Sequence, residues 1–447
     1  MDSSRVVFKR SYRRNPGSSG LSSSTAAHGH IGWIVAGSLA SGLITALLLV
    51  AAPFIPPTEA GATGAVLCGF ALGWAMLTVF SLRFTDQPQL WAAAPALFMG
   101  LSGLLLLAFG SRVHEVLTWV WPPALLAVVI WMFARAHREL RSPSRRLLLY
   151  PVFSLMALAS VAGGYETVHA ATDATDPMPG QLIDVGGHRL HLSCTGSGSP
   201  TVVLQPAAGE ASSDLGSIPQ ALARDTTVCV YDRAGRGWSE PADTTQDATQ
   251  IANDLHTLLQ RGHVPGPYVV AGHSFGGLCT LTFAARYPDE VVGMVLVDSS
   301  APASEPKATP SDGGSYDLTG RVSALLSTSV RFGLGRLVDV PTPSHLRGTI
   351  DEYFFQADSS AEAAASLRDF ANKPLVVLTA GSGSPAGWLA DQEALATLST
   401  DSVHRVLDGI DHPGMVADEK GAAATTRAIL DVVSSIRTAP ARASAEG

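Results

Sequence analysis

Gly272-His273-Ser274-Phe275-Gly276-Gly277 is the stretch that decides the fold of this chain. The residues before it, 268–272, form a short apolar run that is typical of a buried strand, and 275–287 carry a helical pattern. A serine between glycines at such a junction matches G-x-S-x-G, a sharp strand-to-helix turn that raises the serine hydroxyl above a sheet. The alternative interpretation is a plain glycine turn with a solvent-facing serine.

Alternating strand and helix patterns extend this unit in both directions. Helices are expected over 247–260, 275–287 and 414–436. Runs that are apolar throughout are expected of parallel strands covered on both faces, so the pattern predicts a mostly parallel, doubly wound α/β sheet. The eight predicted strands are 181–185, 188–194, 201–206, 226–231, 268–272, 292–298, 374–380 and 402–407.

One long segment, 299–373, interrupts the alternation. It is rich in Pro, Ser and Gly and carries helical patterns only near 318–338 and 360–371. A connection of this length is usually functional. We therefore expect a helical lid over a pocket.

A serine becomes a good nucleophile only when a base removes its proton. Of the 13 histidines, His412 is placed for that role, in a loop after the last predicted strand and before the final helix. A surface histidine beside a turn is the plainer alternative. His188 and His191 are three residues apart on a predicted strand, so they face opposite sides and make a poor metal pair. No cluster of side chains predicts a metal or an organic cofactor.

Residues 181–436 closely resemble the α/β-hydrolase fold enzymes. Residues 231–239, Tyr231 to Ser239, fit Y-D-R-x-G-x-G-x-S, a signature common in that family. The resemblance implies the order serine, acid, histidine along the chain, a Ser-His-acid triad and an oxyanion hole made by two backbone N–H groups. The matching stretches are 201–209 (TVVLQPAAG), 231–239 (YDRAGRGWS), 272–277 (GHSFGG) and 411–414 (DHPG).

The resemblance also assigns the two oxyanion donors. One is the N–H of Phe275, the residue after the nucleophile. The other comes from the loop after 201–206, where the best match is Ala208. The sequence reads Pro206-Ala207 where the family usually has His-Gly, which leaves the geometry of this second donor open.

Two positions compete for the triad acid. Family members commonly place it after the strand expected at 374–380, but that stretch has no carboxylate before Asp391. Some members use the end of the preceding strand, where Asp298 stands. We predict Asp298, with Asp391 as the alternative. Asp411 is adjacent to His412 and poorly placed to hold its ring.

The first 164 residues differ in character. Five stretches lack any charged residue, and each has about the 17–25 residues that cross a hydrocarbon core of roughly 30 Å. Buried helices of a large soluble protein are the alternative, which five such runs in succession disfavour. We predict a basic disordered tail at 1–30, a transmembrane region at 31–164, a linker at 165–180 and a hydrolase domain at 181–447. The five spans are 31–52, 62–82, 90–110, 116–134 and 147–164.

Charge indicates the orientation and excludes one partner class. The tail and segment 135–146 carry five Lys or Arg each, whereas 53–61 has none, so the positive-inside rule places the N-terminus in the cytoplasm and the hydrolase domain outside it. We favour an uncleaved first helix, because no clear small-x-small site precedes Pro53.

Residues 165–447 carry 18 Lys and Arg against 33 Asp and Glu. This negative balance has the wrong sign for binding nucleic acid.

Two cysteines bear on the compartment. Cys194 and Cys229 fall on strands that the family's strand order makes neighbours, so the resemblance favours a disulfide, which fits a compartment outside the cytoplasm. We take these neighbours to be parallel. Parallel strands seldom offer good disulfide geometry, which leaves two buried free thiols as the alternative.

These residues together predict a membrane-anchored serine hydrolase that cleaves an ester, thioester or amide through an acyl-enzyme on Ser274. Its partners are a small-molecule acyl substrate and the lipid bilayer; protein partners are not predicted. Serine at the turn disfavours the family's epoxide hydrolases and dehalogenases, which attack with aspartate. The alternatives are a peptidase of the proline-iminopeptidase kind and a non-catalytic receptor or scaffold that uses the fold as a binding module.

Overall fold

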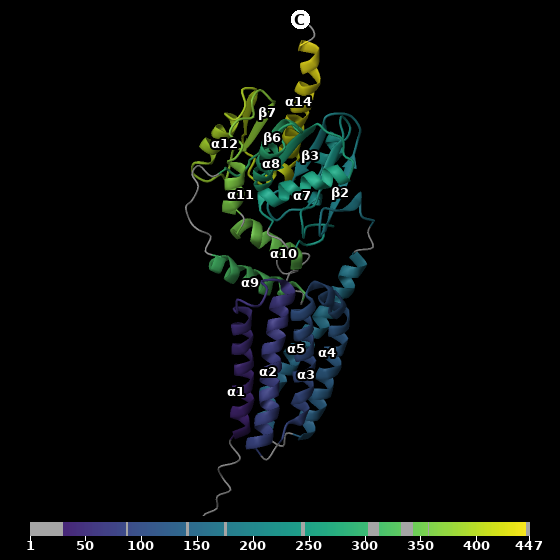
Figure 1. Ribbon diagram of the computed structural model, residues 1–447, viewed down its shortest axis with the longest axis vertical. Helices are drawn as coiled ribbons and strands as arrows, with labels where there is room; N and C mark the ends of the chain where they lie inside the picture. Colours follow the sequence, from purple (N-terminus) through teal and green to yellow (C-terminus); the bar gives the residue numbers. More distant parts are fainter. Residues whose placement is uncertain are drawn as a thin grey trace, which may run out of the picture.

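The chain folds into a helical bundle and an α/β domain, stacked end to end with further helices between them (Figure 1). The C-terminus lies at the end of the α/β domain away from the bundle. This architecture comes from a computed structural model, which describes residues 30–85, 88–139, 143–173, 177–242, 246–302, 313–331, 343–355 and 357–443. The predicted tail at 1–30 lies almost wholly outside the described residues.

Apolar helices build the bundle. Within the described residues, four stretches are long and apolar enough to cross a membrane: Ile31–Val50, Glu59–Phe84, Leu90–Phe109 and Val116–Arg138. The fifth predicted span lies within α5, a helix that runs beside α4 (Figure 1). α5 is not one of those four stretches, and it continues into the predicted linker. The bundle elements are α1 (His30–Val50), α2 (Glu59–Phe84), the short η2 (Leu90–Ala92), α3 (Ala93–Phe109), α4 (Ser111–Glu139) and α5 (Pro143–Asp173).

The outer surface of the bundle is apolar. Trp33 of α1 is 83% exposed, and Leu155 of α5 is 68% exposed. Water-soluble proteins rarely leave large contiguous apolar surfaces uncovered. Outer faces of this kind are consistent with contact with lipid, and α5 shares them although it is not one of the four candidate spans.

Two carbonyls of α4, beside its prolines, accept hydrogen bonds from hydroxyl groups of α5. Pro122 lies within α4 and has no N–H to donate to the carbonyl of Thr118. The hydroxyl of Thr167 on α5 donates to that carbonyl at 3.4 Å, and the hydroxyl of Ser160 donates to the carbonyl of Pro122 at 2.5 Å. Such contacts allow a proline in a membrane helix, so α4 continues unbroken through Pro122 and Pro123.

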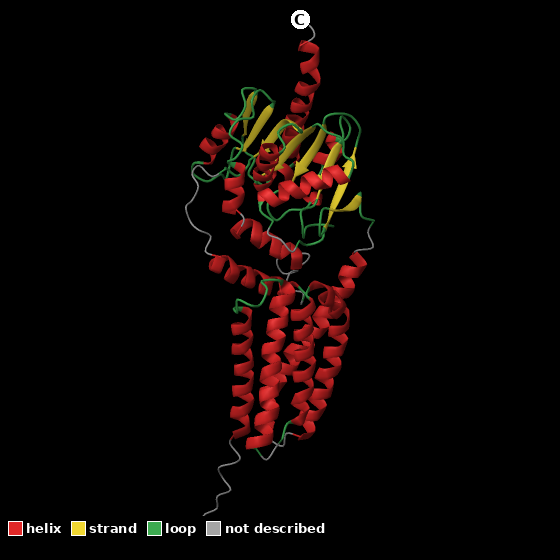
Figure 2. Cartoon of the chain, in the orientation of Figure 1, coloured by secondary structure: helices red, strands yellow, loops and turns green. Residues whose placement is uncertain are grey.

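The α/β domain contains an eight-stranded sheet with the order β1-β2-β4-β3-β5-β6-β7-β8 (Figure 2). β2 runs antiparallel to β1 and to β4, and the other neighbouring strands are parallel. The predicted mostly parallel sheet of eight strands is confirmed. The strands are β1 (Gln181–Asp184), β2 (Arg189–Thr195), β3 (Thr201–Gln205), β4 (Val228–Tyr231), β5 (Tyr268–His273), β6 (Val291–Val297), β7 (Leu375–Ala380) and β8 (Ser402–Leu407).

Helices cover both faces of the sheet, so its central strands are buried throughout. Along β5, Val270 packs into the core beneath α7 and α8, and Val269 packs into the core on the opposite face, as side chains alternate along a strand. The first face carries α7 (Ala248–Arg261) and α8 (Phe275–Arg286); the second carries α6 (Ile218–Leu222), α13 (Gly414–Ala417) and α14 (Glu419–Ala443). Two short elements flank the sheet, η3 (Ser212–Leu215) and α12 (Trp388–Ala396).

The insertion between β6 and β7 is helical and lies on the bundle side of the domain (Figure 1). The helix expected near 360–371 ends at Ala364, and α10 was not predicted. Parts of the insertion, 303–312 and 332–342, lie outside the described residues. The lid elements are α9 (Gly313–Val330), α10 (Pro343–Ile350), the π-helical turn η5 (Asp351–Phe355) and α11 (Ala357–Ala364).

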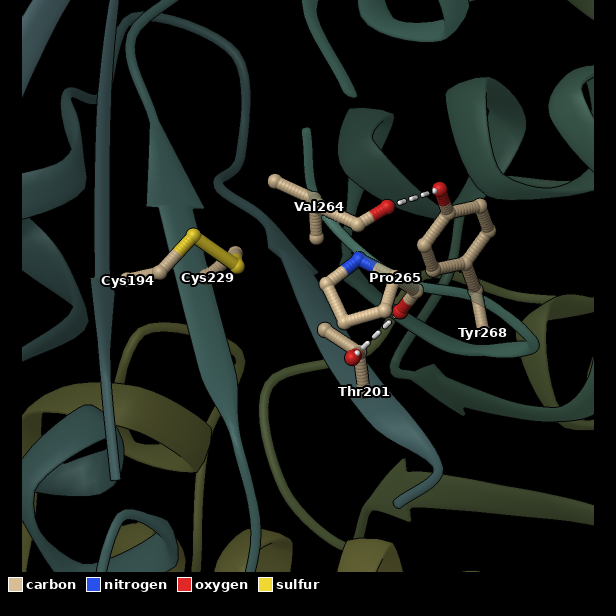
Figure 3. Close-up of a disulfide and its surroundings, with 6 residues drawn as sticks. All are labelled: Cys194, Thr201, Cys229, Val264, Pro265 and Tyr268. Carbon is tan, nitrogen blue, oxygen red and sulfur yellow. Dashed lines mark hydrogen bonds between the residues drawn. A yellow bond between two sulfur atoms is a disulfide. The ribbon is translucent and has the colours of Figure 1, made fainter. Parts of the chain in front are cut away.

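Cys194 and Cys229 form a disulfide (Figure 3). The two cysteines are directly opposite each other in the β2–β4 pair, with Cα atoms 4.1 Å apart. Our expectation that these strands are parallel was wrong, because β4 pairs with β2 in the antiparallel sense. Directly opposed residues of antiparallel strands come this close, so the bonded alternative holds.

Removing this disulfide is expected to destabilise the α/β domain. It closes a loop of 35 residues, and a crosslink of this kind contributes about 2–4 kcal/mol. The pair Cys194→Ala and Cys229→Ala should lower the melting temperature under non-reducing conditions. Dithiothreitol should lower the melting temperature of the wild type and leave that of the double variant unchanged. Equal melting of the wild type with and without reductant would contradict the bond.

Candidate active site

Ser274 occupies the turn between β5 and α8 in a strained conformation. Its φ of 55° and ψ of −120° cost of order 1–3 kcal/mol for a residue with a Cβ. Neighbouring backbone holds it there: its N–H donates to the carbonyl of Val297, and its own carbonyl accepts from the N–H groups of Gly277 and Ser300. The predicted strand-to-helix turn is therefore present, with the serine at its apex.

The glycines of the motif are required by close backbone approach. A Cβ on Gly272 would lie 2.2 Å from the carbonyl oxygen of Gly276. A Cβ on Gly276 would lie 2.2 Å from the carbonyl oxygen of Gln205, at the end of β3. Any side chain at either position would push α8 away from the sheet. The two glycines thus bring the serine turn against the loop that follows β3.

Asp298 and His412 are in direct contact. The Nδ1 atom of His412 lies 2.5 Å from Oδ2 of Asp298. The other carboxylate oxygen accepts hydrogen bonds from the N–H of Ala380 at 3.0 Å and the indole N–H of Trp388 at 2.7 Å. Asp298 is 1% exposed, so three donors orient a buried carboxylate. Asp391, the alternative acid, lies exposed in the first turn of α12, and its described contacts include no bond to His412.

Ser274 and His412 come to the same edge of the sheet. Ser274 follows β5, Asp298 follows the adjacent strand β6, and His412 follows β8, all at carboxyl ends of parallel strands. His273, beside the serine, donates from Nε2 to the carbonyl of His412 at 3.0 Å, and their rings lie 4.7 Å apart. No hydrogen bond joins the Ser274 hydroxyl to the His412 imidazole in the described contacts. Such bonds often tighten only when substrate binds.

The two predicted oxyanion donors lie on either side of the close approach. Phe275 is the first residue of α8, where a helix leaves its N–H groups without an internal partner. In the described part of the chain, the N–H groups of Ala208 and Phe275 have no hydrogen-bond partner. The neighbouring N–H of Ala207 is instead used by the carboxylate of Glu210, at 2.9 Å. Both donors therefore remain available to a ligand.

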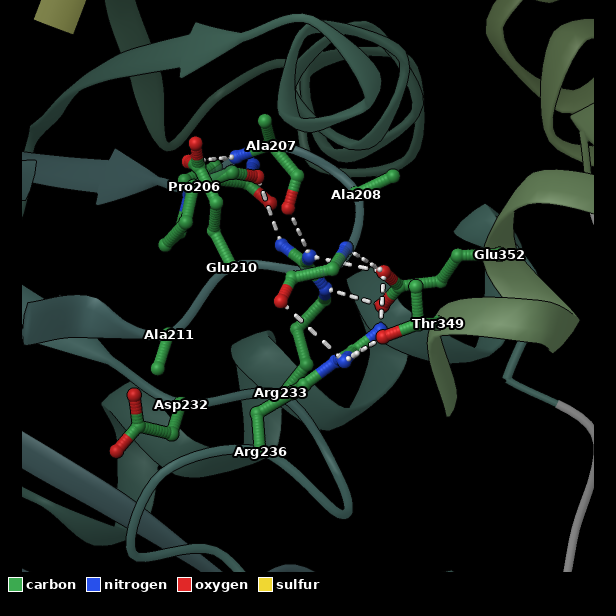
Figure 4. Close-up of polar contacts among 12 residues, drawn as sticks. Pro206, Ala207, Ala208, Glu210, Ala211, Asp232, Arg233, Arg236, Thr349 and Glu352 are labelled. Atoms are coloured by element: carbon green, nitrogen blue, oxygen red, sulfur yellow. Dashed lines mark hydrogen bonds and ion pairs between the residues drawn. The ribbon is translucent and has the colours of Figure 1, made fainter. Parts of the chain in front are cut away.

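A buried ion network lies behind this loop (Figure 4). Glu352 of η5 is 5% exposed and pairs with Arg233 at 2.9 Å and with Arg236 at 2.7 Å. Its carboxylate also accepts from the N–H of Gly209 at 2.7 Å. Burial tends to raise the pKa of Glu352, but the two guanidinium groups outweigh it and hold this pKa below its usual value.

Sequence reasoning missed this network. Arg233 and Arg236 belong to the quoted 231–239 signature, which could have flagged them as positions with a specific role. Glu352 has no such signal, because it lies in the insertion more than 100 residues away. As for metals, the described residues contain no group of three or more His, Cys, Asp or Glu side chains that could hold an ion.

The sheet order and the serine turn define an α/β-hydrolase domain, and residues 200–321 match the family model of the alpha/beta hydrolase fold. The part of the chain that the structure describes after the bundle therefore has the alpha/beta hydrolase fold.

The curated relatives that this chain resembles include distant ones. An uncharacterised protein of Schizosaccharomyces pombe is 26% identical over 250 residues, which cover 47% of this chain and 44% of that protein. The 2-(acetamidomethylene)succinate hydrolase of Mesorhizobium japonicum is 30% identical over 132 residues, 29% of this chain and 46% of that enzyme. The crystal structure of an enol-lactonase from Burkholderia xenovorans aligns with a TM-score of 0.44 at 21% identity, covering 57% of this chain and 100% of that one. The matches span less than half the length of both curated relatives.

The ionised form of Asp298 should contribute to stability in a pH-dependent way. Burial alone would raise its pKa, but the hydrogen bonds from His412, Trp388 and Ala380 hold the pKa below the ordinary value. A lowered pKa stabilises the fold above the unfolded value of about 3.9, and the effect is lost as the pH falls through the folded value. The melting temperature of wild type minus that of Asp298→Asn should therefore be largest near neutral pH and shrink below about pH 4. A difference in melting temperature that stays constant with pH would show that the charge of the Asp298 carboxylate does not stabilise the fold.

Proposed function

We propose that the α/β domain is a serine hydrolase that cleaves an ester, thioester or amide bond of a small-molecule substrate. The observation that carries the proposal is the meeting of three groups at one sheet edge: the strained Ser274, the partly exposed His412 and the buried Asp298 against its ring. The family's hydrolytic character supports it. Ser274 is the proposed nucleophile, His412 the general base and Asp298 the orienting acid.

The proposed reaction has two halves. The Ser274 hydroxyl attacks the substrate carbonyl while its proton passes to Nε2 of His412, and the tetrahedral intermediate then expels the leaving group, which takes that proton. Water attacks the resulting acyl-serine by the same route and releases the acid. Asp298 accepts from Nδ1 of His412, which keeps Nε2 free to act as base and stabilises the imidazolium that forms.

The N–H groups of Ala208 and Phe275 are the proposed oxyanion hole. Negative charge grows on the substrate oxygen only as the tetrahedral intermediate forms, so these donors stabilise the transition state more than the bound substrate. Loss of one such donor costs about 2.7–4 kcal/mol in a serine protease. Proline and alanine at 206 and 207 replace the family's usual pair, but the N–H of Ala208 has no hydrogen-bond partner among the residues that the structure describes.

The domain is proposed to be held at a membrane and to lie outside the cytoplasm. Support comes from the apolar helices with their exposed large side chains and from the Lys and Arg of the tail and of 135–146. The disulfide between Cys194 and Cys229 agrees with an oxidising compartment.

The test of the activity is covalent labelling by a fluorophosphonate, followed by hydrolysis of p-nitrophenyl esters of increasing chain length. The wild type should be labelled at Ser274, and Ser274→Ala should lose both labelling and hydrolysis. Asp298→Asn should lower kcat by up to about 10⁴-fold, as loss of the triad acid does in a protease. Asp391→Asn is the matched control and should be close to wild type.

Other outcomes of this test would contradict the proposal. A folded wild type that is neither labelled nor active on any ester of the panel would favour the non-catalytic binding module. Near-wild-type turnover of Asp298→Asn with a loss in Asp391→Asn would move the acid to Asp391.

Reporter fusions in a bacterial host test the orientation. Alkaline phosphatase is active only outside the cytoplasm, so a fusion after Ala443 should be active and a fusion after Glu139 inactive. Green fluorescent protein exported as an unfolded chain does not fluoresce, so it should give the opposite pattern at the same two sites. The reverse result at both sites would place the hydrolase domain in the cytoplasm.

A further inference from the structure

The lid is fastened to the end of the bundle nearest the α/β domain. We call residues 50–63, from the end of α1 to the first turns of α2, the rim. Arg321 of α9 is 2% exposed and donates to the carbonyl of Val50 at 3.0 Å. Helices leave their last carbonyls unpaired and concentrate negative potential there, so a buried guanidinium is well suited to the end of α1.

Two further lid arginines bind the same rim. Arg331, directly after α9, forms an ion pair with Glu59, the first residue of α2, with its second contact at 3.0 Å. Arg347 of α10 donates to the carbonyl of Pro57 at 2.6 Å. The lid is thus attached to the bundle through cationic side chains on two different helices.

The opposite side of the lid is hydrogen-bonded to the α/β domain at the loop after β3, which carries Ala208, one of the two proposed oxyanion donors. Arg236 holds α10 by donating to the carbonyl of His345 at 2.9 Å and to the hydroxyl of Thr349 at 2.6 Å. The carboxylate of Glu352 accepts hydrogen bonds from Arg233, from Arg236 and from the N–H of Gly209. Since α9 packs against α10 and η5, the rim and Glu352 are joined through contiguous elements.

Arg233 connects both proposed oxyanion donors. Its guanidinium donates to the carbonyls of Pro206 at 2.8 Å and Ala207 at 2.6 Å, which fixes the loop just before Ala208. The same group lies 5.5 Å from the ring centroid of Phe275, within the range of a cation–π contact. The carboxylate of Glu352 therefore orients a side chain that contacts the backbone just before Ala208 and the ring of Phe275.

We propose that Glu352 is a positioning residue for the oxyanion hole and that the bundle, by holding the lid at the rim, keeps Glu352 in place. The inference rests on the proposed function and gives the membrane region a part in catalysis beyond anchoring. Glu352 does not contact the reacting atoms. It acts through Arg233 on donors whose interaction strengthens in the transition state, so its loss should lower kcat more than it changes KM.

The first part of the test replaces Glu352 in the full chain reconstituted in lipid nanodiscs. Glu352→Gln should lower kcat for a p-nitrophenyl ester, and slow fluorophosphonate labelling of Ser274, by about tenfold or more, up to the 10²–10³-fold of a lost oxyanion donor. KM should change little. Because Glu352→Gln leaves two buried arginines unpaired and could impair folding, Glu352→Asp is made beside it. It keeps the charge and should recover part of kcat.

The second part breaks the attachment at the rim, far from the chemistry. Arg331→Glu places like charges opposite Glu59 and should lower kcat by about 2–30-fold, the range of a coupling between distant sites. Adding Glu59→Arg restores an ion pair of reversed polarity and should recover much of the loss. The matched control is Arg405→Glu, which breaks the surface pair with Asp431 at 2.8 Å on β8 and α14 and should leave kcat unchanged.

The outcomes separate the two proposals. A wild type that labels and turns over normally, with folded Glu352 and Arg331 variants at the same rates, overturns the positioning role and leaves the hydrolase function standing. A rise in KM without a fall in kcat also overturns the positioning role. So does a fall in kcat of Arg331→Glu that the added Glu59→Arg does not reverse. A folded wild type without labelling or turnover removes the hydrolase function, and the positioning role with it.

Discussion

The structure depends on one close approach of backbone to backbone. The turn at Ser274 is strained, and it persists because α8 begins within contact distance of the end of β3, which only glycine at 272 and 276 permits. That contact brings the first turn of α8 against the end of β3 and the start of the loop that follows it. The parallel strands on either side then bring Asp298 and His412 to the same edge. Local strain in the backbone is thus balanced by the packing of the whole sheet.

Charge is handled differently on the two sides of this site. Asp298 is buried, but three donors surround it, so it remains an anion beside the imidazole. Glu352 is buried between two guanidinium groups and a backbone N–H. Isolated charges are too costly to bury, whereas such clusters are tolerated when every lone pair has a donor. Removing one partner leaves the others uncompensated, which makes these positions sensitive.

The bundle and the α/β domain meet through the lid. An anchor requires only one apolar helix, whereas here the rim, from the end of α1 to the first turns of α2, binds Arg321, Arg331 and Arg347 of the insertion. The same insertion closes on the loop after β3 through Glu352. On the proposed positioning role, the bundle provides a fixed surface against which the lid is set, which would give a physical reason for several apolar helices beside an α/β-hydrolase fold.

Sequence alone determined the parts of this protein that follow from local pattern. The eight strands, the serine turn, the apolar helices and the placement of Asp298 and His412 after strands could all be predicted, because periodicity and short motifs report directly on backbone geometry. Tertiary structure decided what depends on residues distant in the chain. The antiparallel pairing that joins Cys194 to Cys229, the helix α10, and the contact of Glu352 with arginines more than 100 positions away have no local signature. Such contacts are selected by the fit of surfaces that exist only after the chain has folded.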